Sequence, residues 1–197
     1  MQIFFELIAT FPEPVRILDV GGTVDLWRTS PMPGKLHVTL LNLTKSPTVG
    51  VENIISLVGD ARKMPEFPDN SFDVCFSNSV IEHVGTLYDQ IAMAKEIRRV
   101  SKAYFVQTPA RNFPIEPHFL VPGWQYLPIR LRAWMLQQRK VGWAEKFSDP
   151  LLAQAEVEQI RLLTRREMEM LFPDANIYEE KVGPFTKSIV VFSSKQN

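Results

Sequence analysis

The sequence predicts an α/β fold: a doubly wound, mostly parallel sheet with a C-terminal antiparallel hairpin and a small cap of helix and loop. Three observations lead to this prediction. Five short apolar runs, rich in β-branched residues, each end in glycine, proline or small polar residues. These runs are nearly continuous in apolar residues, as expected for a parallel sheet covered on both faces. A helical pattern separates the last two runs, which favours a parallel crossover.

The predicted parallel strands lie at 15–22, 36–43, 53–61, 71–78 and 103–109. Between the fourth and the fifth, residues 85–102 repeat apolar side chains at helical spacing and end in basic residues, as a helix C-terminus favours. The linker 28–35 is too short and too broken for a long helix. The first crossover is therefore expected to be abbreviated, built from roughly VDLWR.

The C-terminal part predicts two further helices and a hairpin. Residues 149–163 read as one helix, and residues 163–175 as a second. In the second, Thr164 and Glu167 have the spacing of a capping box. Residues 176–194 predict two strands around a VGPF turn, an antiparallel hairpin at the edge of the sheet.

The sequence pattern changes after the fifth predicted strand. Residues 109–128 combine prolines and aromatic residues without a clear period, which indicates an ordered loop that covers something. Residues 129–143 pair tryptophans with four basic residues and no acid. This stretch is either a cap helix with a solvated basic face or a surface for a peripheral membrane contact or an acidic partner.

The length predicts one domain over residues 1–197. We expect its core at 15–110 and 163–194, with a cap insertion at about 111–162. The sequence leaves the oligomeric state open.

The bulk composition excludes several classes of protein. Lys+Arg and Asp+Glu are equal, 22 each, so the chain lacks the basic excess typical of a protein that grips nucleic acid. The one cysteine, Cys75, lies in an apolar run and is expected to be a small buried side chain. The N-terminus has no basic region before its apolar stretch and is a poor signal peptide. A cytoplasmic protein is the expectation.

The predicted strands end in small or polar residues, and parallel strands bring such ends to one crevice. The ends offer Asp19, Gly21, Gly22 and Thr23; Asn42; Asp60 and Ala61; and Ser77 and Asn78. The first turn reads GGTVDL, which lacks the spacing of the dinucleotide-binding fingerprint. Asp25 near the following helix start would repel a phosphate, so the turn suits a cationic or zwitterionic ligand better.

The strings VRILDVGG, LLNL, GDARKMPEFPDNSFDVCFSNSVIEHV and YFVQTP occur in this order over about residues 15–110. In order and spacing they resemble the class I S-adenosylmethionine-dependent methyltransferases, and most closely the type 11 methyltransferase-domain group. The resemblance implies a Rossmann-like fold and S-adenosylmethionine as cofactor.

The resemblance also implies roles for the strand-end residues. The loop of Asp19, Gly21, Gly22 and Thr23 would approach the methionine part of the cofactor, although two glycines of the family's usual D-x-G-x-G-x-G pattern are replaced here. Asn42 stands where the family has an acid for the ribose hydroxyls. Asp60 and Ala61 match positions that meet the adenine, and Ser77 and Asn78 match positions beside the sulfonium.

Two histidines are candidates for catalysis. His83 either supports the start of the next helix or faces the methyl acceptor, and His118 is either a loop histidine bonded to backbone or a general base that Glu116 orients. His37 starts a strand and is expected to be structural. The histidines and Cys75 are scattered without ligand spacing, so no metal site is expected.

The resemblance predicts in-line methyl transfer to a small-molecule acceptor, with a lipid- or sugar-linked one among the options. The aromatic loop favours an apolar or aromatic-bearing small molecule, or a lipid-linked one. The strand-four end lacks the N-P-P-[YF] pattern of methyltransferases that act on base amines, so no DNA acceptor is expected. Two alternatives remain at this stage. One is a nicotinamide-dependent oxidoreductase, disfavoured by the missing third glycine, and the other is a non-catalytic protein of the same fold that acts through partners.

Overall fold

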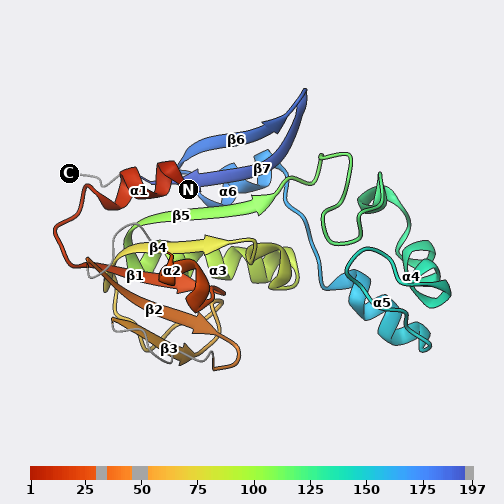
Figure 1. The fold of residues 1–197 in the computed structure, drawn as a ribbon, viewed down its shortest axis with the longest axis horizontal. Coiled ribbons are helices and arrows are strands. Elements are labelled where there is room, and N and C mark those ends of the chain that lie inside the picture. The colour runs from red at the N-terminus through yellow and green to blue at the C-terminus, as the bar shows by residue number, and fades with distance from the viewer. Residues whose placement is uncertain (30–34, 46–52, 194–197) are drawn as a thin grey trace.

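A computed structural model describes residues 1–29, 35–45 and 53–193 of the 197-residue chain. It contains a seven-stranded sheet in the order β3-β2-β1-β4-β5-β7-β6 (Figure 1). The first five strands are parallel, and β7 pairs antiparallel with both β5 and β6. The strands are β1 Val15–Val20, β2 Leu36–Asn42, β3 Ile54–Val58, β4 Phe72–Asn78, β5 Ser101–Pro109, β6 Asn176–Val182 and β7 Phe185–Phe192.

All seven strands lie where the sequence predicts them, and the predicted fold class is confirmed. The first crossover helix, α2 (Val24–Arg28), has the predicted residues VDLWR and no more. Residues 30–34 of the linker and residue 194 of the predicted hairpin lie outside the described residues.

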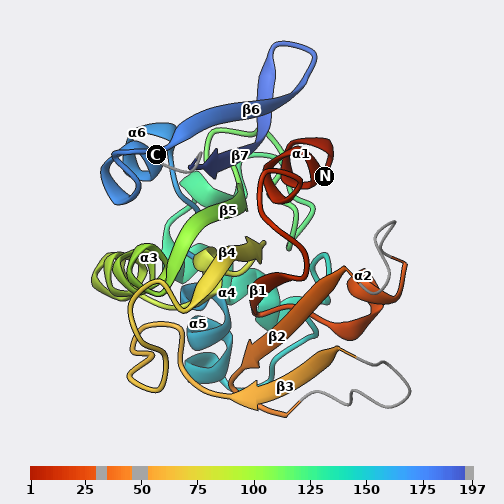
Figure 2. The same ribbon diagram turned by 90° about the vertical axis from the view of Figure 1, so that its left-hand side faces the viewer.

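Helices cover both faces of the sheet (Figure 2). The helices α3 (Leu87–Val100) and α6 (Arg165–Leu171) lie on one face, and α1 (Gln2–Ile8) and α2 lie on the other. Both α3 and α6 begin with a complete capping box, from Thr86 with Asp89 and from Thr164 with Glu167. The α6 box confirms the spacing noted in the sequence.

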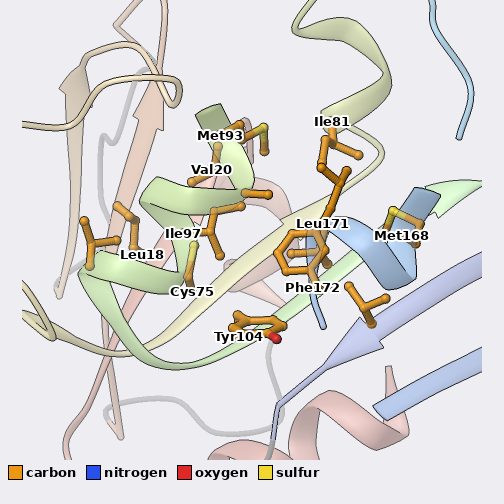
Figure 3. Packing of buried hydrophobic residues seen from close by; sticks show 14 of the residues in the cluster. Leu18, Val20, Cys75, Ile81, Met93, Ile97, Tyr104, Met168, Leu171 and Phe172 are labelled. Carbon is orange, nitrogen blue, oxygen red and sulfur yellow. The ribbon is translucent and has the colours of Figure 1, made fainter. Parts of the chain in front are cut away.

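The face under α3 and α6 holds the larger apolar cluster (Figure 3). Cys75 of β4 is completely buried there against the helices, which confirms its expected role as a small apolar side chain. On the opposite face, the ring of Phe76 stacks on Phe105 and lies 4.7 Å from Phe4 of α1. The sequence did not predict α1, whose apolar side chains complete this second layer.

A cap lies beyond the carboxyl ends of the strands (Figure 1). It contains a short 3₁₀ helix (η2, Trp124–Tyr126), α4 (Ile129–Gln138) and α5 (Pro150–Glu158). A separate apolar cluster, which includes Phe119, Trp124 and Leu136, holds these elements together. Within the described ranges, every helix is too short or too polar to cross a bilayer.

A buried polar network joins the cap to the sheet. Gln90 of α3 donates through Nε2 to the carbonyls of Ile81 and Arg161, each at 2.9 Å. In return, Arg161 Nη1 donates to Gln90 Oε1 at 2.7 Å, and the Arg161 amide donates to the carbonyl of Glu82 at 2.8 Å. The segment that follows α5 is therefore fixed to the 3₁₀ helix η1 (Ile81–His83), directly after β4.

The Gln90 network predicts the effect of a near-isosteric apolar substitution. We expect Gln90→Leu to lower the free energy of unfolding by about 2–3 kcal/mol, because it leaves the carbonyls of Ile81 and Arg161 and one nitrogen of the Arg161 guanidinium without their partner. Urea unfolding at neutral pH measures the change. Gln154→Leu is the matched control, since the Gln154 amide bonds Glu158 on the exposed side of α5, and we expect a change within about 0.5 kcal/mol. Equal stability of the two variants would contradict the structural role of Gln90.

Candidate active site

A cavity of about 540 Å³ opens at the carboxyl ends of the parallel strands. This volume lies in the range of sites for small organic ligands and cofactors. Four of the predicted cofactor residues and one of the predicted histidines line it: Gly21, Asn42, Asp60, Ala61 and His83. The other predicted cofactor residues, Asp19, Gly22, Thr23, Ser77 and Asn78, are not on its wall.

The glycine turn after β1 is shaped by its protein neighbours. Gly21 has a φ of +75°, and a Cβ there would lie 2.4 Å from Cγ2 of Val80. At Gly22 a Cβ would lie 1.7 Å from Oδ2 of Asp19. Both positions therefore require glycine for packing, and only Gly21 also lines the cavity.

Asp19 lies behind this turn and is completely buried. The indole Nε1–H of Trp27 donates to its Oδ2 at 2.6 Å. Burial raises the pKa of the Asp19 carboxyl to about 7, against the opposing effect of the Trp27 hydrogen bond. In this structure Asp19 supports the loop rather than forming part of the cavity wall.

Asn42 at the end of β2 holds the same turn from the other side. Its Nδ2 donates to the Gly22 carbonyl at 3.0 Å, while the residue lines the cavity. An amide can accept a hydrogen bond from a hydroxyl, although more weakly than a carboxylate would. The position can therefore serve a ribose and also fix the loop.

Ser77 and Asn78 end β4 in different environments. Ser77 is completely buried, and its Oγ has no hydrogen-bond partner in the described part of the chain. Asn78 is exposed to solvent. Neither residue lies on the wall of the cavity as it stands.

Asp60 and Ala61 lie on the wall beyond β3. The Asp60 carboxylate receives the Arg62 guanidinium, with Nη2 at 2.7 Å from Oδ2, and these hydrogen bonds hold the pKa of Asp60 below its usual value. Arg62 also donates to Asp89 at 2.9 Å, which links this loop to the start of α3. Sequence reasoning missed Arg62, although it lies two residues after Asp60 and also lines the cavity.

The structure brings the two candidate catalytic histidines together. Nε2 of His83 lies 3.1 Å from Nε2 of His118, and Nδ1 of His118 lies 2.5 Å from Oε1 of Glu116. The other Glu116 oxygen, Oε2, accepts the backbone amides of His118 at 2.9 Å and Phe119 at 2.7 Å. Glu116 thereby fixes both the loop and the His118 ring, in the orienting role expected of it.

The environments of the two rings push their pKa values apart. Burial and the neighbouring His118 lower the pKa of His83, against the charge of Glu116. Burial also opposes protonation of His118, but the hydrogen bond and charge of Glu116 outweigh it and raise the pKa of His118. His118 is therefore the ring that holds an extra proton more readily.

Glu82 lies beside this pair and is completely buried. Thr108 Oγ1 donates to its Oε2 at 2.9 Å, while Oε1 has no hydrogen-bond partner among the described residues. Burial raises the pKa of Glu82 to about 7, so this carboxyl holds a proton more readily than an ordinary glutamate does.

Glu82, His83 and His118 also offer a set of potential metal ligands. One ligand atom from each lies within 4.8 Å of the others. The expectation that no such grouping exists rested on spacing along the sequence, and the fold brings these groups together across 35 residues. Imidazole and carboxylate are suitable ligands for zinc or iron, so the geometry allows a metal as well as a chain of hydrogen bonds.

The comparisons agree with this geometry. A family model described as "Methyltransferase domain" matches residues 31–104, and a search of the curated proteins finds no match. Among solved structures, a SAM-dependent methyltransferase from Methanosarcina mazei has a TM-score of 0.58 at 15% identity, covering 100% of this chain and 99% of the other. One from Aquifex aeolicus has a TM-score of 0.56 at 16% identity, covering 97% and 86%.

At these identities the solved structures establish the fold, and the family match adds the activity and the cofactor. The matched segment contains Asn42, Asp60, Ala61 and His83 of the cavity wall. Residues 31–104 match the methyltransferase-domain family, and the chain as a whole has the fold of solved S-adenosylmethionine-dependent methyltransferases.

Proposed function

We propose that this methyltransferase acts on a hydroxyl or amine of a small-molecule acceptor that enters past His83 and His118. The observation that carries the proposal is the chain of contacts from the wall of the cofactor cavity at His83, through His118, to Glu116. A base is useful only when the acceptor must lose a proton, as a hydroxyl or a protonated amine must.

The cavity fits S-adenosylmethionine in size and chemistry. Asn42 would hold the ribose, Asp60 with Ala61 would hold the adenine, and the Gly21 backbone would border the methionine part. Leu41, Val80 and Val84 add apolar wall for the flat adenine and the carbon chain. When bound, S-adenosylmethionine supplies a methyl group already activated by the sulfonium, so positioning of the acceptor supplies much of the acceleration.

The histidine pair provides a path for the acceptor's proton. With His118 neutral, its Nδ1–H donates to Glu116, so Nε2 of His118 accepts from Nε2–H of His83. Nδ1 of His83 is then the unprotonated nitrogen. This nitrogen would take the acceptor's proton, while bound S-adenosylmethionine would supply the methyl group. The Nε2 proton of His83 passes to His118, where Glu116 stabilises the imidazolium.

Charge and surface favour a small acceptor over DNA. The net charge is zero, and the cap adds exposed aromatic surface, with Trp134 55% and Trp143 76% exposed near Arg130 and Lys140. Such a surface suits an acceptor carried on a lipid or sugar and a peripheral contact with an anionic membrane. The proposal includes the carrier-linked acceptor and the membrane contact, and an experiment with and without vesicles distinguishes them.

Cofactor binding provides the first prediction. We expect Asp60→Ala to weaken binding of S-adenosylhomocysteine by about 10- to 100-fold, because the variant loses a charged hydrogen-bond acceptor for the adenine and the anchor of Arg62. Isothermal calorimetry measures the affinity. Asp69→Ala removes another carboxylate of the same loop, one that pairs with Arg99 outside the cavity, and is expected to bind like the wild type. Equal affinity of Asp60→Ala and wild type would contradict the adenine role.

Acceptor screening tests the proposal itself. We expect release of S-adenosylhomocysteine with at least one small hydroxylated or amine-bearing molecule and none with double-stranded DNA. For that acceptor, His83→Gln should lower kcat about 10²- to 10⁴-fold, whereas His37→Gln should not. Offering lipid-linked acceptors with and without anionic vesicles separates the membrane contribution. Methylation of DNA, or full activity of His83→Gln, would count against the proposal, and loss of activity on chelation with EDTA would favour a metal over the proton path.

The histidine pair also predicts a titration that needs no acceptor. In the wild type, the two coupled rings should titrate with His118 above its ordinary pKa of about 6.5 and His83 below it. Glu116→Gln removes the hydrogen bond and the charge that most favour imidazolium at His118, so the pKa of His118 should fall, because only the charge of Glu82 then opposes burial. NMR of the ring Cε1 protons follows both residues, and Glu145→Gln, an exposed cap carboxylate, is the control. An unchanged His118 titration in Glu116→Gln would refute the assigned contact.

A further inference from the structure

A second cavity of about 220 Å³ lies between the loop after β5 and the cap. Three arginines line it, Arg111, Arg132 and Arg161, together with Glu116 and the aromatic side chains of Phe119 and Trp124. It is separate from the cofactor cavity, with which it shares no lining residue.

Two of these arginines have no ion-pair partner among the described residues. Arg161 is ion-paired with Glu167 and hydrogen-bonded to Gln90. Arg111 and Arg132 form no ion pair within 4.0 Å with any residue of the ranges that the structure describes. The charges of Glu116 and Glu158 favour the Arg132 cation from a distance, while burial and Arg111 oppose it. Glu116 itself is engaged by His118 and two backbone amides. The cavity therefore holds an excess of positive charge.

Three polar atoms of the cavity residues are buried without a hydrogen-bond partner in the described part of the chain: Nε1 of Trp124, Oε1 of Gln125 and Nε of Arg132. Trp124 is only 1% exposed. Leaving such groups unpaired costs on the order of 1–3 kcal/mol each. Two of the three are donors, and both suit an anion, whereas the Gln125 oxygen suits a ligand that also carries a donor group.

The two cavities lie on either side of the same chain segments. Gln159 lines the cofactor cavity, and the residues that follow it, Ile160, Arg161 and Leu162, line the second cavity. On the other side, Glu116 lines the second cavity and connects through His118 to His83 on the wall of the first. A molecule held in the second cavity therefore borders Glu116, whose carboxylate holds the His118 ring.

We propose that the second cavity binds the oxyanion of an organic acid, a carboxylate or a phosphate monoester, as the anchoring end of the methyl acceptor. This inference rests on the proposed function, because it names the class of acceptor for the same site. The planar guanidinium fork of Arg132, with Arg111 beside it, matches the paired oxygens of such a group. Phe119, Ile160 and Leu162 cover the carbon skeleton next to it.

Calorimetry with three matched probes tests the site. Benzoate and phenyl phosphate carry the two forms of the anion on one ring, and benzamide is the neutral analogue of benzoate. Each is titrated into the wild type saturated with S-adenosylhomocysteine. We expect at least one anion to bind about tenfold or more tightly than benzamide, and the better of the two identifies the anion. Equal binding of benzamide, or no binding of either anion at millimolar concentration, would overturn the proposal.

Variants assign the binding to this cavity. Arg132→Gln should weaken the anion by about 10- to 100-fold, while Arg130→Gln makes the same charge change on the same helix outside the cavity and should not. Arg111→Gln gives an independent test if Arg132→Gln does not fold. Affinity for S-adenosylhomocysteine is measured in every sample. If S-adenosylhomocysteine binds and the anions do not, only the proposed anion site is wrong. If the anions bind and S-adenosylhomocysteine does not, the proposed methyltransferase function is wrong instead. Anion binding that survives both arginine variants would also overturn the assignment.

Discussion

The buried amide of Gln90 is the constraint on which the arrangement of the site depends. It holds the carbonyl of Ile81 and both the carbonyl and the guanidinium of Arg161, and so joins the turn after β4 to the chain leaving α5. Because an amide in a dry interior must pair all of its groups, this junction has one favourable geometry. That geometry places His83 on one cavity and Arg161 on the other.

The buried charges near this junction form a balanced set. Two carboxyls, Glu82 and Glu116, lie close to two histidines. Burial raises the pKa of Glu82 to about 7, which limits the negative charge it contributes, whereas Glu116 is fixed by three donors. The Glu116 carboxylate therefore faces a histidine pair that takes up one proton. The pair can gain or lose that proton without leaving a large uncompensated charge.

The sequence predicts the centre of the sheet well because β1, β4 and β5 are buried on both faces and appear as continuous apolar runs. The capping box of α6 is likewise a local signal. The sequence predicts Asp60 and Asn42 because parallel strand ends converge. The contact between His83 and His118, and the gathering of Arg111, Arg132 and Arg161 around one cavity, depend on how the cap folds back onto residues far apart in the chain. No local pattern encodes that distance, and α1 was likewise recognisable only from the aromatic layer that it completes.

The altered glycine loop after β1 acquires a physical reason from its neighbours. A side chain at position 21 would collide with Val80, and one at position 22 would collide with the Asp19 carboxyl. Both glycines are therefore required by the packing of neighbouring side chains. The indole N–H of Trp27, from the short helix α2, donates a hydrogen bond to the Asp19 carboxyl. A loop held in this way by a carboxyl, an indole and the amide of Asn42 is fixed before ligand arrives. Such fixing reduces the entropy that binding must overcome, which offsets the loss of the further glycines in the family pattern.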